Sequence, residues 1–470
     1  MTIHFGTDGW RAIIGEEYTF SNVAKVLQAF CDLQEAAQGR SIIVGYDRRF
    51  QSRAFAEQAA RVLLGNGFKV ELAHQFAPTP CVSWMTKQRQ ALAGVVITAS
   101  HNPFQWNGVK FKEDYGGSAS PEFTSQVEAQ LQRNEGSGPR PRELSLEEGE
   151  QRGLLTYFDP QGAYVRQLEK LIDIGKIRRA KLKIVADPIY GAGGGFFQKL
   201  LGKQVVEIRG EENPAFGGVN PEPIEKNLAP AIAAVRKFRA HIGLATDGDA
   251  DRIGAVDEKG RFVDSHHIFA LILRHLVTVK KWKGTVVQTV STTRMIQRLT
   301  EKFGLELIET PIGFKYICQA FRKTHPLMGG EESGGIGIAK HIYERDGILC
   351  GLFLLEILAT YRKPFSKIIA ELQKEVGPLV FRREDLHWPL EKIRLVKERL
   401  AAGSLPETPG FRLRSKNFLD GFKFNFTDDS WLLIRPSGTE PLLRVYAEAP
   451  SDRKLTSLLR AARSFLQSLG

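Results

Sequence analysis

Three aspartates spaced two residues apart, Asp247, Asp249 and Asp251, form the most concentrated group of potential metal ligands in the sequence. Residues two apart in an extended segment point to the same side, and carboxylates held that close repel one another unless a cation neutralises them. The segment therefore indicates a divalent metal site. An EF-hand loop fails because Arg252 stands at the sixth position, where that turn requires glycine. A plain solvated acidic turn is the less favoured alternative.

A serine, Ser100, closes an apolar run in the segment "ITASHNP", residues 97–103. Asn and Pro are turn formers and Ser satisfies free backbone groups, so a simple turn is the ordinary interpretation. Ser100 becomes a candidate functional residue because other loops of the chain also carry side chains that could bind a ligand.

Two of these loops could bind a phosphorylated sugar. In "GGEESGG", residues 329–335, the glycines let the backbone approach a ligand while Glu331 and Ser333 offer acceptors for sugar hydroxyls, although such turns are usually structural. In "RPSGTEP", residues 435–441, a phosphate cradle is predicted from Arg435, Ser437, Gly438 and Thr439. The sequence has no P-loop motif, and "GAGGGF" lacks the third glycine of a dinucleotide loop. Neither an NTPase nor a nicotinamide enzyme is favoured.

The elements that must position these loops alternate between strands and helices. "SIIVGYD", "FKVELA" and "HIGLATDGD" have strand patterns, and the helical segment from Ser52 is stopped by Gly65-Asn66-Gly67. Such alternation predicts α/β blocks with functional residues on loops at the carboxyl ends of strands. We expect three α/β domains, at 1–150, 151–256 and 257–374, and a smaller α+β domain at 375–470.

Composition narrows the possible partners. The 470 residues include 65 basic and 53 acidic side chains, a net charge of +12 that suits nucleic acid, an anionic surface or phosphorylated small molecules. The basic residues are spread along the chain without a nucleic-acid-binding signature, so anionic small substrates are favoured over nucleic acid. The most apolar stretch, from Ile348, carries Glu356 and is shorter than the ~20 residues of a membrane span. It predicts a buried helix and no membrane role.

The four cysteines lie far apart and form no C-x-x-C pair, so neither a disulfide framework nor a zinc site is indicated. The amino terminus lacks an apolar run of signal-peptide length. We therefore expect a cytoplasmic protein.

Taken together, the loops give the sequence a strong resemblance to the α-D-phosphohexomutase family over nearly its whole length. The motifs that carry it, in the family's order, are "FGTDGWR", "GYDRRFQS", "TASHNP" with "NGVKF", "DGDADR", "STTRM", "TPIGFK", "GEES" and "RPSGTEP". The resemblance implies three similar mixed-sheet α/β domains and a smaller α+β domain around a central cleft.

The resemblance also implies roles for the matched residues. Ser100 would carry a phosphoryl group, and Mg2+ would be bound by the three aspartates and an oxygen on that phosphoserine. Arg252 would be a neighbouring cation, and His101 and Lys110 would lie near the phosphate. Arg11 and Lys315 would neutralise phosphate or transfer protons. Glu331 and Ser333 would bind sugar hydroxyls, and the distal phosphate would be bound by Arg435, Ser437, Gly438 and Thr439.

One position departs from the family pattern. Some members have a histidine where this chain has Gly335, so its role is absent or supplied by another residue such as His341 in "HIYERDG". The proton donor stays open between Lys315, His101 and groups near His341.

The implied activity is interconversion of glucose 1-phosphate and glucose 6-phosphate through a hexose 1,6-bisphosphate. A phosphomannomutase or dual-specificity mutase is the nearest alternative, followed by a phosphoglucosamine mutase. A sugar phosphatase that uses Asp247 and Asp249 would need no serine, and it would release inorganic phosphate steadily.

Overall fold

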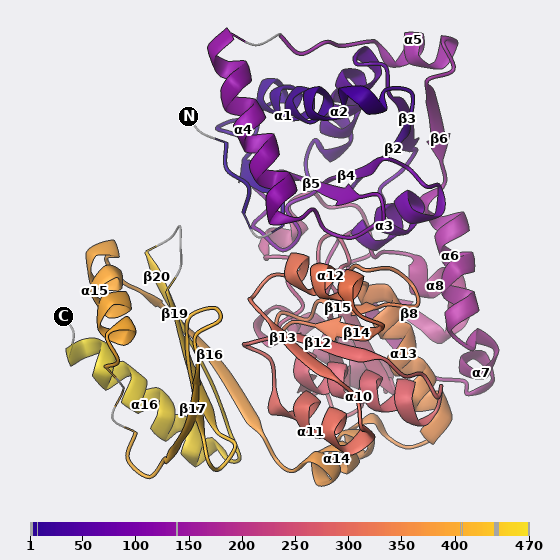
Figure 1. Cartoon of the computed structure of the whole chain (residues 1–470). Coiled ribbons are helices and arrows are strands. Elements are labelled where there is room, and N and C mark those ends of the chain that lie inside the picture. Colours follow the sequence, from indigo (N-terminus) through magenta and orange to yellow (C-terminus); the bar gives the residue numbers. More distant parts are fainter. Residues whose placement is uncertain are drawn as a thin grey trace.

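The computed structural model describes residues 3–6, 8–137, 140–404, 406, 408–436 and 441–468, with the backbone alone at 136 and 137. Among these residues the strands form four sheets, one after another along the chain. Figure 1 shows the first sheet and its helices at the top, the second and third below it, and the fourth on the left.

The first domain contains a six-stranded mixed sheet in the order β1-β5-β4-β2-β3-β6. Strands β4, β2, β3 and β6 run parallel, whereas β5 is antiparallel to β4 and β1. All five residues of β4 are buried, as expected for a central parallel strand. The elements are β1 (Trp10–Ile13), α1 (Phe20–Leu33), β2 (Ser41–Tyr46), α2 (Ser52–Gly65), β3 (Lys69–Ala73), α3 (Thr79–Gln88), β4 (Ala93–Ile97), β5 (Trp106–Glu113), α4 (Pro121–Ser137), α5 (Leu146–Gln151) and β6 (Leu155–Phe158).

The second domain is built on a five-stranded sheet in the order β11-β10-β9-β7-β8. Strands β7, β8 and β9 are parallel to one another. Strand β10 is antiparallel to β9, and β11 is antiparallel to β10. The elements are α6 (Pro160–Leu171), α7 (Ile174–Arg179), β7 (Ile184–Asp187), α8 (Phe196–Leu201), β8 (Val205–Glu207), α9 (Ala229–Phe238), β9 (Ile242–Thr246), β10 (Ile253–Asp257) and β11 (Phe262–Val263).

The third domain has a four-stranded sheet in the order β13-β12-β14-β15, in which only β15 is antiparallel to its neighbour. The elements are α10 (Ser265–Thr278), β12 (Thr285–Thr289), α11 (Arg294–Phe303), β13 (Leu307–Thr310), α12 (Phe314–Lys323), β14 (Pro326–Gly330), β15 (Ile336–Ile338), α13 (Gly347–Tyr361) and α14 (Phe365–Val376). The apolar stretch from Ile348 is the buried helix that the sequence predicts. In the described part of the chain, every helix is too short or too polar to cross a membrane.

The fourth domain is an antiparallel sheet in the order β16-β20-β19-β18-β17 with its own hydrophobic core. The elements are β16 (Val380–His387), α15 (Leu390–Ala401), β17 (Leu413–Asn417), β18 (Phe422–Phe426), β19 (Trp431–Pro436), β20 (Leu442–Ala449) and α16 (Asp452–Ser468). A separate buried cluster of Val290, Trp431, Leu433 and Tyr446 joins this domain to the third. The four-domain α/β architecture expected from the sequence is thus confirmed.

Two strands lie beyond the domain limits expected from the sequence. Strand β6 pairs with β3, so the first sheet continues to Phe158 rather than ending before residue 150. Strand β11 pairs with β10, so the second sheet continues to Val263 and the polar turn at 257–262 is a hairpin within it. The remaining division of the chain stays a prediction.

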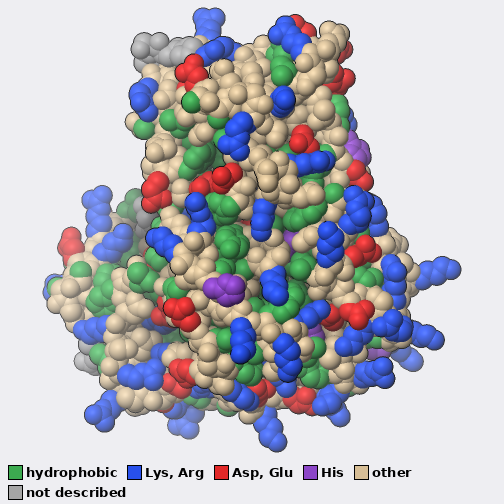
Figure 2. Space-filling model, turned by 45° about the vertical axis from the view of Figure 1, so that its right-hand side comes forward, with side chains coloured by type: hydrophobic (Ala, Val, Ile, Leu, Met, Phe, Trp, Pro, Cys, Tyr) green, Lys and Arg blue, Asp and Glu red, His purple; other side chains and the backbone are tan. Residues whose placement is uncertain are grey.

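The positive charge is dispersed on the face that Figure 2 shows. Lys and Arg side chains are scattered over this face, and Asp and Glu side chains stand between them. A basic stripe of the kind that follows a nucleic-acid backbone is not present on this face.

Candidate active site

Ser100 lies in the loop that leaves the carboxyl end of β4, and its side chain reaches the second domain. Its backbone has φ 52°, a left-handed conformation that non-glycine residues adopt only when surrounding contacts hold it. The Ser100 amide donates to Thr98 Oγ1 at 2.8 Å, and its hydroxyl donates to Asp247 Oδ2 at 2.8 Å. The serine hydroxyl is therefore aimed at the aspartate loop.

Arg49, from the loop between β2 and α2, holds the serine loop in place through hydrogen bonds. This buried guanidinium donates to Asp47 Oδ2 at 3.1 Å, and Asp47 in turn accepts from Thr98 Oγ1 at 2.6 Å. Its terminal nitrogens donate to the carbonyls of Ser100 (2.6 Å), Asn102 (2.7 Å), Pro103 (2.8 Å) and Trp106 (3.0 Å). One side chain thus satisfies four carbonyls around Ser100.

Asp247, Asp249 and Asp251 lie together after β9 and are completely buried. Oxygen atoms from the three carboxylates lie within 4.8 Å of one another. Burial raises the pKa of Asp247, and the neighbouring carboxylates of Asp251 and Asp249 raise it further. Among the described residues, Oδ1 of Asp249 and Oδ1 of Asp251 are buried without a hydrogen-bond partner. Repelling carboxylates with unused oxygens fit a divalent cation, as the sequence predicts.

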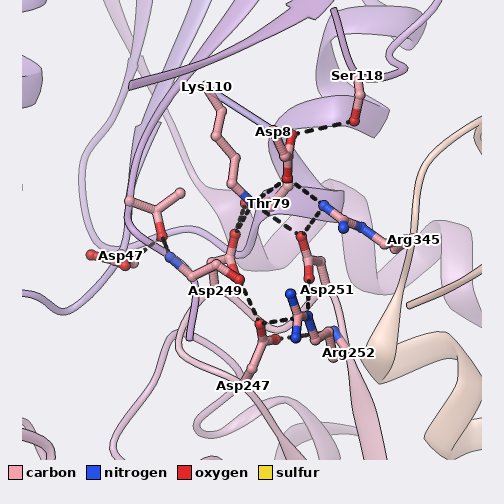
Figure 3. A network of polar contacts seen from close by, with 12 residues as sticks. Asp8, Asp47, Thr79, Lys110, Ser118, Asp247, Asp249, Asp251, Arg252 and Arg345 are labelled. Carbon is pink, nitrogen blue, oxygen red and sulfur yellow. Dashed lines mark hydrogen bonds and ion pairs between the residues drawn. The ribbon is translucent and has the colours of Figure 1, made fainter. Parts of the chain in front are cut away.

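Lys110, on β5, supplies a positive charge to two aspartates of this cluster (Figure 3). Its Nζ lies 2.8 Å from Asp249, 3.1 Å from Asp251 and 2.8 Å from Asp8. Burial alone would lower the pKa of Lys110, but these carboxylates together raise it. Thr79 Oγ1 donates to the same Asp249 oxygen at 2.6 Å. Lys110 is therefore a fixed, charged group inside the site.

Arg345 continues the network into the third domain. Its guanidinium pairs with Asp8, lies 2.7 Å from Asp251 Oδ2 and lies 3.5 Å from Glu331 Oε2. Glu344, beside it in sequence, pairs with Lys112 Nζ at 2.6 Å. Residues from three domains therefore meet in one buried polar network (Figure 3).

The glycine-rich loop of the third domain lies directly against the aspartate loop. Arg252 pairs with Gly335 in an isolated antiparallel bridge, and the Ile253 amide donates to the Gly334 carbonyl at 3.1 Å. Glu331 is buried, and burial raises its pKa to about 7. Ser333 is half-buried in the same loop. The structure thus brings the expected sugar-binding residues next to the loop of Asp247, Asp249 and Asp251.

Three more of the expected residues lie in or beside this network. Arg11, on β1, donates to Asn102 Oδ1 in the serine loop at 2.7 Å, and burial lowers its pKa. Burial lowers the pKa of His101, and the charges of Arg252 and Arg11 lower it further. Lys315, on α12, lines a small cavity together with Asp8, and burial lowers its pKa as well.

Arg435 ends β19 in the fourth domain. Its Nε donates to Asp420 Oδ1 at 2.8 Å, while Asp420 Oδ2 accepts from the Ile312 amide at 2.8 Å. Arg435 also stands opposite Arg444 on β20. Ser437, Gly438 and Thr439 of the predicted cradle lie outside the described residues.

A role for His341 as the substitute for the missing histidine stays a prediction. His341 is buried beside Asp346, with 3.2 Å between Nε2 and Oδ2, and its ring packs near that of Tyr164 on α6. Arg345 occupies the space next to Gly335, because a Cβ at residue 335 would lie 2.2 Å from Arg345 Cδ. The "HIYERDG" segment therefore places Arg345 against Gly335 and Asp251.

Sequence reasoning assigned no role to several residues of this network. These are Asp8, Asp47, Arg49, Thr79, Lys112, Glu344 and Arg345. Asp8, Asp47 and Arg49 stand in motifs that resemble the family, and a charged residue inside such a motif was the signal available. Their interaction partners are far away in the sequence, as in the pair of Asp8 and Arg345, so no local sequence pattern predicts the contact.

Comparison with known proteins gives four family models in succession. They are described as phosphoglucomutase/phosphomannomutase α/β/α domains I, II and III and the C-terminal domain, and they match residues 2–137, 162–260, 264–376 and 389–464.

Individual relatives match over almost the whole chain. A phosphoglucomutase/phosphomannomutase from Thermococcus kodakarensis is 31% identical, with 98% of each chain covered. A phosphoglucosamine mutase from Carboxydothermus hydrogenoformans is 30% identical, with 96% of each covered. A crystal structure from Thermus thermophilus, provisionally named a phosphomannomutase, has 32% identity and a TM-score of 0.86, with 99% of each chain covered.

Proposed function

Because the chain belongs to the α-D-phosphohexomutase family, whose enzymes move a phosphoryl group within a hexose phosphate, we propose that it interconverts glucose 1-phosphate and glucose 6-phosphate. The observation that carries the proposal is the buried hydrogen bond from the Ser100 hydroxyl to Asp247. It puts the expected phosphoryl carrier against the expected metal ligands, from two different domains.

The site supplies positive charge where a phosphoryl group would sit. A magnesium ion held by Asp247, Asp249 and Asp251 would add a divalent charge that stabilises the transferring group. Phosphoryl transfer depends mainly on positioning and on such charge stabilisation. Lys110 and Arg252 contribute fixed cations next to the same carboxylates. This arrangement can lower the barrier without an organic cofactor.

The proposed reaction runs in two balanced transfers. In the first, a sugar hydroxyl attacks phosphoserine 100, the Ser100 Oγ–P bond breaks, and the hydroxyl proton passes to a base. The product, hexose 1,6-bisphosphate, then turns round in the site. In the second transfer, Ser100 Oγ attacks the other phosphate, and the departing sugar oxygen takes up a proton. The serine ends phosphorylated, as it began.

Proton transfer is better suited to Lys315 than to Arg345. Burial lowers the pKa of Lys315, which brings this pKa closer to neutral pH. The pKa of Arg345 is raised instead, because Asp251 and Asp8 outweigh the effect of burial. An efficient acid or base has a pKa near the working pH. We assign Arg345 to charge stabilisation and Lys315 to proton transfer.

Sugar and phosphate would be bound by different loops, which allows both orientations of the intermediate. Glu331 and Ser333 would accept and donate hydrogen bonds to the ring hydroxyls. Arg435 would hold the distal phosphate with its terminal nitrogens, since Asp420 already occupies its Nε. Ser437, Gly438 and Thr439 would complete this cradle.

Substrate preference is tested by coupled assays with the 1-phosphates of glucose, mannose and glucosamine, at equal concentration with Mg2+ and a trace of glucose 1,6-bisphosphate. We expect glucose 1-phosphate to give the highest kcat/KM, with mannose 1-phosphate slower or comparable. Phosphoglucosamine mutase is the second candidate, because a relative of that name matches nearly the whole chain. A highest kcat/KM for glucosamine 1-phosphate would overturn the preference and leave the mutase mechanism in place.

A further inference from the structure

A groove of about 870 Å3 lies between the third and fourth domains, lined by residues of α11, β13, β17 and β18. Its volume falls within the range of small-molecule sites, which occur preferentially at domain junctions. None of the residues assigned above to phosphoryl transfer or sugar binding lines it. The groove is therefore a candidate for a second binding site, separate from the candidate active site.

The polar wall of the groove is rich in hydrogen-bond donors. Arg294, at the start of α11, is held in place by two side-chain amides: it donates to Gln297 Oε1 and, at 2.8 Å, to Asn425 Oδ1. Its Nε is buried and has no hydrogen-bond partner among the described residues. Amide partners fix the guanidinium without neutralising it, so its charge is available to a ligand.

Two further cations line the groove from the fourth domain. Arg414 shares the single carboxylate of Asp429 with Arg298, at 3.1 Å and 3.0 Å. Lys416 is exposed on the edge strand β17. Together with Arg294 they place three cationic side chains around one hollow.

The two carboxylates that line the groove are already engaged. Glu301 accepts from Gln297 Nε2 at 2.8 Å. Glu309 accepts from Gln288 at 3.2 Å, from Asn417 at 3.2 Å and from Lys423 at 3.3 Å. Lys423 compensates the charge of Glu309, and the three lining cations outnumber the two lining carboxylates, so the groove is better suited to an anion than to a cation.

An aromatic side chain lines the groove on the β17–β18 connection. Phe418 is 45% exposed, while its ring makes edge contacts with Phe422 and Phe424. An exposed ring braced from behind offers a face on which a flat ligand ring can stack. We propose that this groove binds an organic phosphate that carries a flat ring, of the nucleoside monophosphate type, with the phosphate on Arg294, Arg414 and Lys416 and the ring on Phe418.

Such a ligand would bridge two domains. Arg294 belongs to the third domain, whereas Arg414, Lys416 and Phe418 belong to the fourth, which also carries Arg435. A ligand that contacts both stabilises the arrangement in which both contacts are made. Its binding would therefore be coupled to the position of the distal phosphate cradle.

The test is calorimetric titration of the full chain with AMP, in the presence of Mg2+ and saturating glucose 6-phosphate so that the active site is occupied. We expect one AMP per chain, with adenosine and inorganic phosphate each binding more weakly. The R414Q/K416Q variant should bind AMP at least about tenfold more weakly, since it loses two charge-assisted contacts. The matched control is R394Q/K397Q, which neutralises two exposed cations on α15 in the same domain and should bind AMP normally.

The Phe418→Ala variant distinguishes the contribution of the ligand's ring from that of its phosphate. It should weaken AMP binding and leave the binding of inorganic phosphate unchanged. Both double variants should keep the basal kcat/KM, which also shows that they fold. Absence of AMP binding to the unmodified chain at millimolar concentration would overturn the proposal. So would equal AMP affinity in R414Q/K416Q, or an equal loss in R394Q/K397Q.

Discussion

Replacing Lys110 with methionine tests the charge balance of the site most sharply. Lys110 Nζ lies between 2.8 and 3.1 Å from the carboxylates of Asp8, Asp249 and Asp251. The lysine is 1% exposed, and both metal-loop aspartates are fully buried. Methionine keeps most of the side-chain volume and removes the charge, so the loss can be assigned to electrostatics.

The free energy of unfolding should fall because the substitution leaves buried carboxylates without their cation. Breaking a buried ion pair from one side costs about 3–5 kcal/mol. A domain of about 150–250 residues loses about 2–4 °C of melting temperature per kcal/mol. In metal-free buffer, we therefore expect Lys110→Met to lower the melting transition by about 6–20 °C.

Mg2+ provides the second half of the test, measured by thermal scans with and without the ion. Since the ion neutralises the same carboxylates, it should raise the melting temperature of Lys110→Met by more than that of the unmodified chain. Catalysis should stay low, because in the proposed mechanism Lys110 also stabilises the transferring phosphoryl group.

Lys112→Met is the matched control, because Lys112 lies two residues along the same strand and pairs with Glu344 rather than with the metal loop. It should also lower the melting temperature, but Mg2+ should give it no extra stabilisation. The reasoning would be refuted by a Lys110→Met protein that melts within a degree of the unmodified chain without metal. An equal Mg2+ effect in both variants would refute it as well.

Three further outcomes are expected. Burial raises the pKa of Glu331 to about 7, so its carboxylate ionises between pH 6 and 8; KM for glucose 1-phosphate should fall by up to about tenfold over that range, because only the ionised form accepts two sugar hydroxyl hydrogen bonds. Glu331→Gln should flatten this KM profile, and a profile that keeps its slope would contradict the assignment. Arg49→Lys cannot satisfy the four carbonyls of the serine loop, so kcat should fall about 100-fold with little change in KM; a change in KM alone would count against a positioning role. Asp249→Asn should raise the Mg2+ concentration needed for half-maximal activity by more than about tenfold, and an unchanged requirement would show that Asp249 is not a ligand.

The sequence predicts the parts of the site that depend on local spacing. The sequence predicts that Asp247, Asp249 and Asp251 meet, and they do lie within 4.8 Å of one another. The segment is a turn rather than the extended run expected, because the Ala250 amide donates to the Asp247 carbonyl at 3.1 Å and Ala250 has φ 59°. The placement of Ser100 and Glu331 on loops at strand ends likewise follows from α/β architecture, since such ends carry the functional loops. These residues needed no knowledge of distant contacts.

The long-range ion pairs could not be predicted in this way. Asp8 and Arg345 are separated by 337 positions, and only the packing of the first domain on the third brings them together. Gly335 shows the same limit: the space that it leaves is filled by Arg345, whereas sequence proximity pointed to His341. The full extent of a sheet is likewise hard to predict, because a strand as short as the two-residue β11 carries almost no pattern.

The central claim is that Ser100 carries the phosphoryl group, and mass spectrometry of the tryptic peptide 90–110 tests it directly. After incubation with glucose 1,6-bisphosphate and Mg2+, the peptide should gain the mass of one phosphoryl group, and fragment ions should place it on Ser100 rather than on Thr98. If Ser100 is first phosphorylated with 18O-labelled phosphoryl groups, excess unlabelled glucose 6-phosphate should replace the label on the peptide within the turnover time while the peptide stays phosphorylated. Ser100→Ala should show neither the mass nor the mutase activity. A fully active protein whose Ser100 stays unmodified throughout turnover would contradict the account.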